Sequence, residues 1–403
     1  MTRIAYISAD HGVPIFGRKG CSVHAQEVLR ALVARGAQVN LFTSSAEGEV
    51  PSGLSPITVH VLPRPPKGEP LEREHAAQAG NVALREQLEA AGPFDLIYER
   101  YSLWSYAGLE FANDHGVPGL LEVNAPLIEE QAQYRVLADR AAAEQTAERV
   151  FKAATALLAV SSEVANYLES FPVAQGKIHV VPNGVAPGRF PENLKPACPA
   201  PPGVFTVGFV GTLKPWHGLG ILVQAFALLH RSQPGSRLLI VGDGPEREKI
   251  ELAIKMGNLA HAAQFTGSVP SSEVPALLAS MDVGVAPYPR FANFYFSPLK
   301  VYEYMAASLP VVASRIGQLE TLIVPERNGL LVRPGDAEAL AAALERVKTE
   351  PELRERLGRQ ARETVLRNHT WDQVVERVFQ LAGLPTGPLP ESRLTHSLNH
   401  VSR

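Results

Sequence analysis

Short runs of apolar residues alternate with longer segments of helical periodicity along nearly the whole chain. In the first half, the apolar runs predict strands at Ile4–Ala9, Gln38–Thr43, Thr58–Leu62, Asp95–Tyr98, Gly119–Val123, Ala156–Val160 and His179–Val181. Between the first two strands, apolar residues recur at helical spacing and predict a helix over Val23–Ala34. This alternation indicates a mostly parallel sheet covered by helices on both faces, the doubly wound α/β class.

A proline-rich stretch divides the chain, and the same pattern then restarts. Seven prolines lie between Pro182 and Pro202, where they disfavour both helix and central strand and predict an interdomain connection. The following strands are predicted at Thr206–Val210, Arg237–Val241, Gln264–Thr266, Val283–Ala286, Pro310–Ala313 and Gly329–Val332. The helices between them are predicted around Gly220–Arg231, Pro245–Met256 and Ser272–Ser280.

The length of 403 residues also favours two domains, since one hydrophobic core seldom serves so long a chain. We expect an N-terminal domain over 1–197 and a C-terminal domain over 198–369, both Rossmann-like. A terminal segment over 370–384 contains a helix predicted at Trp371–Ala382. The remaining residues, 385–403, hold prolines and polar residues without periodicity and are predicted to form a disordered tail.

Charge and cysteine content exclude several classes of protein. The formal net charge of −3 argues against a nucleic-acid partner that needs a strongly basic face. Cys21 and Cys198 are far apart and lack metal-ligand spacing, which disfavours a disulfide scaffold and a zinc site. No apolar run approaches the ~18 residues that span a bilayer. We therefore expect a cytoplasmic protein.

Two loops that each join a strand to a helix carry residues suited to an anion. The first, Asp10–His24, opens the first helix, where free amides and the helix dipole favour an anion, and Gly20 in this loop permits close backbone approach. The second contains Gly211, the cation Lys214 and the imidazole His217, which are suitable neighbours for a diphosphate. The plainer alternatives are an ordinary flexible connection for the first loop and a solvated surface lysine in the second.

Two later strand ends carry further candidates. Gly242 opens a Gly-Asp-Gly-Pro turn that an ordinary strand-to-helix connection also explains. Ser297 and Pro298 form a helix start signal, and the free amides of such a first turn can hold phosphate. Glu303 lies further along the same helix, where its carboxylate could accept hydrogen bonds from ribose hydroxyls or form a salt bridge to a neighbouring helix.

In this order, these motifs resemble those of the GT-B glycosyltransferases, and within them the retaining family four (glycosyl transferases group 1). The resemblance extends to about Leu384 and rests on Val181-Pro182-Asn183-Gly184-Val185, Gly211-Thr212-Leu213, Gly242-Asp243-Gly244-Pro245 and Glu303-Tyr304-Met305-Ala306 with Pro310-Val311-Val312-Ala313. It implies two Rossmann-like domains facing each other across a cleft. The N-terminal domain would bind the acceptor and the C-terminal domain a nucleotide-sugar.

The resemblance also implies roles for individual residues. Glu303 would hold the ribose, Gly20 would meet the donor phosphate, and the terminal helix would brace the N-terminal domain. Several charged residues of the family are replaced in this chain. Tyr295 occupies the position of the first glutamate of a pair, and Asn124 occupies that of a histidine. Thr212 and His217 occupy the positions of an arginine and a lysine. The candidate catalytic residues are Lys214, His217, Asn124 and His24. The candidate donor-binding residues are Gly20, Gly211, Thr212, Gly242, Ser297, Pro298, Leu299, Lys300, Glu303 and Tyr295.

The activity that the resemblance implies is transfer of a sugar from a nucleoside-diphosphate sugar to an acceptor hydroxyl, with retention at the anomeric carbon. Helix-start amides and Lys214 would stabilise the departing diphosphate, and the sequence has no Asp-x-Asp motif, so neither a cofactor nor a metal is expected. Two alternatives stay open: a GT-B sugar-nucleotide epimerase and a non-catalytic nucleotide-sugar-binding protein. A NAD-dependent enzyme is disfavoured because neither domain has the full glycine fingerprint.

The acceptor is open among a glycan, a glycolipid and a small molecule. Its contacts are expected from the loops Arg64–Arg73 and Pro126–Arg135. A lipid-linked acceptor would need a membrane-facing patch on the N-terminal domain, to which Arg64, Lys67, Arg73 and Arg85 could contribute. A solvated face is the plainer interpretation of such scattered charges.

Overall fold

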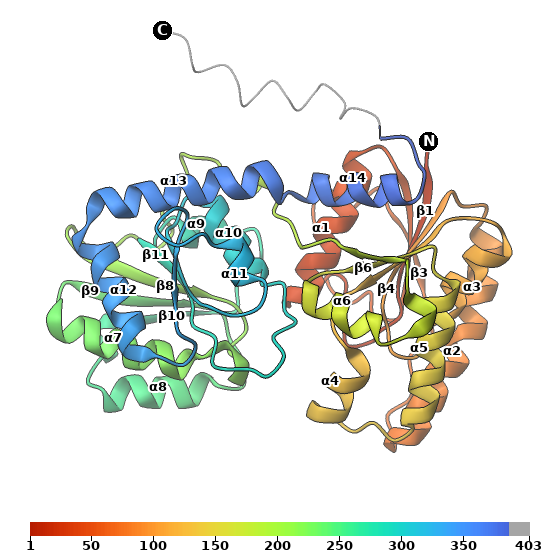
Figure 1. Cartoon of the computed structure of the whole chain (residues 1–403), viewed down its shortest axis with the longest axis horizontal. Helices are drawn as coiled ribbons and strands as arrows, with labels where there is room; N and C mark the ends of the chain where they lie inside the picture. Colours follow the sequence, from red (N-terminus) through yellow and green to blue (C-terminus); the bar gives the residue numbers. More distant parts are fainter. Residues whose placement is uncertain (387–403) are drawn as a thin grey trace, which may run out of the picture.

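The computed structural model of the chain describes residues 1–386, which form two α/β units, each built on a parallel sheet (Figure 1). The first sheet has seven strands in the order β3-β2-β1-β4-β5-β6-β7. Its strands are β1 (Arg3–Ser8), β2 (Gln38–Thr43), β3 (Thr58–Val61), β4 (Leu96–Arg100), β5 (Gly119–Val123), β6 (Ala156–Ala159) and β7 (Ile178–Val180). The second sheet has six strands in the order β10-β9-β8-β11-β12-β13. Its strands are β8 (Phe205–Val210), β9 (Ser236–Val241), β10 (Ala263–Gly267), β11 (Val283–Ala286), β12 (Val311–Ser314) and β13 (Leu330–Val332).

Helices connect the parallel strands and cover the two sheets. The first unit contains α1 (Gly20–Ala34), α2 (Pro70–Ala91), α3 (Ala107–Asp114), α4 (Leu127–Tyr134), α5 (Arg140–Ala153) and α6 (Ser162–Glu169). The second contains α7 (Leu219–Ser232), α8 (Arg247–Met256), α9 (Val274–Leu278), α10 (Leu299–Ala306), α11 (Leu319–Leu322), α12 (Ala337–Thr349) and α13 (Pro351–Asn368). The chain ends its described part with α14 (Trp371–Leu381). The predicted class, two Rossmann-like doubly wound domains, is confirmed.

Each predicted strand overlaps an observed one, and the errors lie at helix ends. The helix predicted from Pro245 begins at Arg247, because residues 244–246 form the turn that leaves β9. The helix predicted over Ser272–Ser280 is only Val274–Leu278. Ser297 was expected as a helix-start residue, but its side chain makes no capping hydrogen bond, and α10 begins at Leu299 after Pro298.

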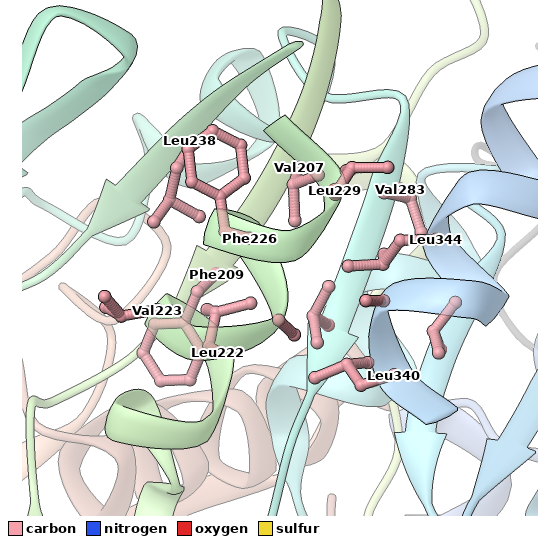
Figure 2. Packing of buried hydrophobic residues seen from close by; sticks show 14 of the residues in the cluster. Val207, Phe209, Leu222, Val223, Phe226, Leu229, Leu238, Val283, Leu340 and Leu344 are labelled. Atoms are coloured by element: carbon pink, nitrogen blue, oxygen red, sulfur yellow. The ribbon is translucent and has the colours of Figure 1, made fainter. Parts of the chain in front are cut away.

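The core of the second unit shows why the hydrophobic pattern predicts the sheet so well. Phe209 on β8 and Val283 on β11 are fully buried, as expected for a parallel sheet covered on both faces. Phe226 on α7 and Leu344 on α12 pack against the same face of the sheet (Figure 2). This packing fixes the strand ends from which the loops of the candidate site emerge.

The two last helices of the described chain run across both units (Figure 1). Helix α13 lies over the second unit, and α14 packs on α1 of the first, with Trp371 and Phe379 buried in the core of that unit. The guanidinium of Arg35, the residue directly after α1, lies 2.8 Å from a carboxylate oxygen of Asp372 on α14. The chain therefore crosses between the units twice, once after β7 and once between α13 and α14. The tail predicted over 385–403 falls, apart from its first two residues, outside the described part.

Candidate active site

The amine of Lys300 is the most unusual group near the carboxyl ends of the second sheet. Lys300 lies in the first turn of α10 and is only 8% exposed, and its Nζ has no hydrogen-bond partner within residues 1–386. It sits 4.1 Å from the ring centroid of Phe209 and 3.1 Å from where a Cβ on Gly211 would lie. Burial lowers the pKa of Lys300 to about 7. A buried, unpartnered amine is costly, and an anionic ligand beside Gly211 would offset that cost.

The first turn of α10 adds free backbone donors beside this amine. The first hydrogen bond within the turn runs from the Val301 amide to the Pro298 carbonyl at 3.0 Å, so the Leu299 and Lys300 amides precede the helical ladder. The residue before the turn, Ser297, is held by the linker between the units. The Asn183 side chain donates to the Ser297 carbonyl at 2.9 Å, and the Asn183 amide donates to Ser297 Oγ at 3.3 Å. These bonds set the position of the helix start relative to the first unit.

Glu303 lies one turn further along α10 and is paired with an arginine from the linker. Nη1 of Arg189 lies 2.8 Å from Glu303 Oε1, and Nη2 donates to the Ser271 carbonyl at 2.7 Å. Burial raises the pKa of Glu303, while Arg189 acts in the opposite direction. The Glu303 side chain keeps 14% of its surface exposed, so its carboxylate combines a fixed orientation with access to solvent. Such a group can accept hydrogen bonds from ligand hydroxyls.

His217 belongs to the same loop as Gly211 but is not a cation. Its Nδ1 lies 2.5 Å from the Thr212 carbonyl, and its ring is packed among aromatic rings that include Tyr288. Burial, and next the nearby charge of Lys300, lowers the pKa of His217 to about 3. The ring is therefore neutral near pH 7, with Nδ1–H donating to the carbonyl and Nε2 left as an acceptor.

Two other candidates of this region differ in their surroundings. The Lys214 amine lies 5.4 Å from the ring centroid of Trp216. The backbone of Gly242 packs so closely on Gly211 that a Cβ there would lie 2.0 Å from the Gly211 carbonyl oxygen. Gly242 therefore holds the Gly211 loop in place through backbone packing, and a direct donor contact from it stays a prediction.

Gly20 begins α1, three residues before the predicted start at Val23, and a Cβ built on Gly20 would meet no atom within 4 Å. The open space around Gly20 is compatible with a close ligand. His24, one turn later, is 3% exposed under the ring of Trp371. Arg100 Nη1 donates to its Nδ1 at 3.2 Å, and burial lowers the pKa of His24 to about 4, so the ring is neutral. The His24 ring is closed off from solvent, and its predicted catalytic role stays a prediction.

The partners of His24 form a buried polar network at the ends of β4 and β5. Glu122 Oε1 accepts from Arg100 Nη1 at 3.1 Å and from Asn124 Nδ2 at 2.5 Å, and Glu122 Oε2 accepts from the Tyr98 hydroxyl. Burial acts to raise the pKa of Glu122. The nearby Arg100 and His24 and the hydrogen bonds from Tyr98 and Asn124 act in the opposite direction and outweigh burial, so the pKa of Glu122 is lowered. Asn124 is thus committed to orienting Glu122, and a contact of Asn124 with substrate stays a prediction.

Tyr295 is turned towards the first unit. Its hydroxyl donates to Glu130 Oε2 on α4 at 3.0 Å, and its carbonyl accepts from Ser161 Oγ at 3.0 Å. Its ring packs against the hydrophobic cluster around α5. These contacts make Tyr295 a tie between the two units, and its predicted contact with the donor is untested.

Sequence reasoning missed the residues that orient the site. Arg189 lies in the proline-rich linker, 114 positions before its partner Glu303, and no local motif marks it. Arg100 and Glu122 could have been recognised from the sequence, because a charged residue inside a buried parallel strand needs a partner of opposite charge. Glu27 on α1 is 3% exposed and 3.9 Å from Arg189, and it was also overlooked.

The comparisons with known proteins agree with this architecture. Residues 18–189 match the family described as Glycosyltransferase Family 4, and residues 204–350 match Glycosyl transferases group 1. A D-inositol 3-phosphate glycosyltransferase of Stackebrandtia nassauensis is 30% identical over 398 residues, covering 90% of this chain and 86% of that protein. A protein of the same name from Pseudarthrobacter chlorophenolicus is 28% identical and covers 85% of each chain.

Solved structures share the whole fold. Sucrose-phosphate synthase from Thermosynechococcus elongatus has a TM-score of 0.74 at 24% identity, over 94% of this chain and 98% of that one. The Anabaena protein HepE in complex with UDP and glucose has a TM-score of 0.68 at 19% identity, over 95% and 100% of the two chains. The chain has the two-domain GT-B fold. It belongs to the glycosyl transferases group 1 family, and it is a glycosyltransferase that takes its sugar from a nucleotide-sugar donor.

Two further observations concern metals and membranes. Within residues 1–386, no group of three or more His, Cys, Asp or Glu side chains is arranged to hold a metal ion. None of the helices in the described part combines the length and apolarity required to cross a bilayer. Of the proposed basic patch, Arg64 pairs with Glu47 at 2.6 Å, and Arg85 pairs with Asp114 at 2.7 Å.

Proposed function

We propose that this protein is a retaining glycosyltransferase that binds the donor diphosphate between the Gly211 loop and the start of α10, with Lys300 as its principal cation. The observation that supports this proposal is the buried amine of Lys300, which lacks a partner among the described residues and points at Gly211. Departure of the diphosphate develops negative charge on its oxygens. A preorganised cation and helix-start amides in a site with little water stabilise that charge most effectively.

Glu303 is the proposed ribose ligand in the same site. Arg189 fixes one oxygen of its carboxylate, and the other remains available to accept hydroxyl hydrogens. The nucleoside would therefore lie along α10, with its diphosphate at the helix start and its sugar directed towards the first unit. The acceptor hydroxyl would enter from the loops of that unit.

Retention is proposed to follow from attack on the same face of the sugar from which the diphosphate leaves. The leaving phosphate accepts the proton of the acceptor hydroxyl as the new bond forms, so this step needs no protein carboxylate. The neutral ring of His217 can accept a sugar hydroxyl through Nε2. No bound metal is required where Lys300, Lys214 and the amides carry the leaving-group charge.

The test measures release of nucleoside diphosphate from a panel of UDP-, GDP- and ADP-sugars with mixed hydroxyl acceptors, with and without EDTA. We expect turnover with one nucleotide class, a product with the donor's anomeric configuration by NMR, and no effect of EDTA. Lys300→Met is expected to lower kcat/KM at least 100-fold, while Lys255→Met, an exposed lysine on α8, has no effect. An inverted product, or equal activity of the two variants, would contradict the proposal.

A further inference from the structure

Two histidine side chains meet at the amino edge of the second sheet. His230 lies in the last turn of α7, and His261 lies in the short 3₁₀ turn Ala260–Ala262 directly before β10. Their Nε2 atoms are 3.3 Å apart. The candidate donor site lies at the opposite edge, since the strands are parallel and Gly211 follows the last residue of β8.

The surroundings of His230 fix the position of its proton. Its Nδ1 lies 3.1 Å from the Ser236 carbonyl and 3.3 Å from Ser236 Oγ. Ser236 Oγ donates its own hydrogen to the Gln233 carbonyl at 2.8 Å, so both neighbours of Nδ1 are acceptors. The neutral ring therefore carries its proton on Nδ1, and Nε2 keeps its lone pair. A bond of this kind, from the second ring nitrogen to a carbonyl, is the usual support of a metal-ligating histidine.

The distances between the two rings match those of two ligands on one tetrahedral zinc ion. Two Zn–N bonds of about 2.05 Å at the tetrahedral angle place the nitrogens about 3.3 Å apart and the ring centroids about 5.2 Å apart. The observed separations are 3.3 Å between the Nε2 atoms and 5.2 Å between the centroids of His230 and His261. A straight N–H···N hydrogen bond of the same length would place the centroids about 5.6 Å apart. The rings are therefore bent away from the line that joins their nitrogens, as two ligands of one ion are.

An ion can reach this pair from solvent. His261 is exposed and His230 is half-buried. Since the part of the chain that the structure describes holds no cluster of three or more potential metal ligands, water would occupy the remaining coordination positions. Imidazole nitrogens favour zinc over Mg²⁺ and Ca²⁺, which prefer oxygen ligands.

We propose that His230 and His261 form a zinc site that ties α7 to the turn before β10. Strand β10 is an edge strand of the second sheet and is only partly buried. A zinc ion that bridges two residues 31 positions apart binds the folded chain more tightly than the unfolded chain, and it therefore stabilises this edge. His230 lies about 16 Å along the helix axis from Leu219, the first residue of α7, which follows the Gly211 loop. The site is therefore independent of the proposed transfer chemistry.

Zinc binding to the full, tag-free chain is measured by competition with a fluorescent zinc chelator, after treatment with EDTA and desalting. We expect His261→Gln to weaken zinc binding at least tenfold, because loss of a group that merely orients a zinc ligand already costs about 10–100-fold. His261 is exposed, so this variant should keep the circular dichroism spectrum of the wild type. The matched control is His75→Gln, which removes an exposed histidine on α2 and should leave zinc affinity unchanged.

Thermal unfolding gives a second readout. ZnCl₂ should raise the melting temperature of the wild type and of His75→Gln, MgCl₂ should not, and His261→Gln and His230→Gln should each lose most of the rise. Absence of zinc binding to the wild type, or equal zinc affinity in the wild type and in both variants of the pair, overturns the proposal. Turnover of a nucleotide-sugar should be the same in His261→Gln and the wild type, so a failure of this site and a failure of the proposed function are seen separately.

Discussion

The guanidinium of Arg189 lies 2.8 Å from the carboxylate of Glu303 and ties the linker between the domains to the helix that begins at the candidate donor site. Both side chains are mostly buried, with 18% and 14% of their surfaces exposed. The pair thus fixes one oxygen of Glu303 and leaves the carboxylate at the edge of the site. This relationship connects the path of the linker to the geometry of nucleotide binding.

Replacement of Glu303 tests the ribose assignment. We expect Glu303→Gln to weaken nucleoside-diphosphate binding about tenfold, since a hydrogen bond to a charged group contributes roughly 1.5–3 kcal/mol. The amide oxygen can still accept from Arg189, so the fold should persist by circular dichroism. Glu326→Gln, an exposed glutamate paired with Arg346, is the matched control and should bind normally. Unchanged affinity in Glu303→Gln would remove the ribose role.

The buried amine of Lys300 predicts a pH dependence of donor binding. Its pKa in the free protein is about 7, well below the ordinary lysine value, so the amine is largely neutral above pH 8. A bound diphosphate favours the protonated form, so binding takes up a proton and affinity falls as pH rises above 7. The neighbouring His217, with a pKa of about 3, stays neutral throughout this range.

Calorimetry with a nucleotide-sugar at pH 6.5 and 8.5, in buffers of different ionisation enthalpy, measures this proton uptake. A nucleotide-sugar is the right ligand because its diphosphate does not itself titrate in this interval. In Lys300→Met the uptake should vanish and the affinity should no longer change with pH. Uptake that persists in this variant would assign the proton to another group.

Replacement of Gly20 tests whether the donor phosphate lies against the start of α1, because the substitution can change binding without lowering protein stability. A Cβ on this residue would meet no protein atom within 4 Å, and alanine has a higher helix propensity than glycine, so Gly20→Ala should not lower the melting temperature. If the donor phosphate lies against this helix start, the added methyl group should weaken nucleotide-sugar binding. Gly80→Ala on α2, which likewise meets no atom within 4 Å, is the control. Equal affinities in the two variants would place the phosphate elsewhere.

The buried His24 predicts a loss of stability on acidification. Its folded-state pKa of about 4 lies below the unfolded value of 6.5, so the unfolded chain binds more protons between these values. Stability is therefore full above pH 6.5 and falls as pH decreases towards 4, by about 2 kcal/mol at pH 5. Urea unfolding at pH 7 and pH 5 measures this change. In His24→Gln the loss between the two pH values should be smaller by about that amount, and an identical loss would contradict the buried, neutral ring.

The fold could be predicted from sequence because its signals are local. The central strands of the second sheet are short apolar runs, such as Val283–Ala286, that are buried on both faces, whereas the edge strand β10 (Ala263–Gly267) is only partly buried. The first helix was predicted over Val23–Ala34, and α1 begins three residues earlier, at Gly20. Helix ends were less accurate: Ser297 has a good capping side chain, yet it bonds to Asn183 instead.

The site could be predicted only in part, because its orienting contacts are long-range. Lys300 and Glu303 stand in one recognisable segment, but nothing in that segment indicates that Arg189 reaches Glu303. The replacement of a glutamate by Tyr295 marks a departure from the family, but the sequence does not reveal that its hydroxyl bonds to Glu130. Partners of buried charges are decided by tertiary packing, which no local pattern encodes.

The measurement that tests the central claim most directly is a thermal-shift comparison of the wild type and Lys300→Met with UDP, GDP, ADP and NAD in excess. A ligand at ~100 times its dissociation constant stabilises the folded state by about 2.7 kcal/mol, enough to raise the melting temperature visibly. The account predicts that one nucleoside diphosphate raises the melting temperature of the wild type and that Lys300→Met loses most of this shift. No shift with any nucleoside diphosphate, or an equal shift in the variant, would contradict it.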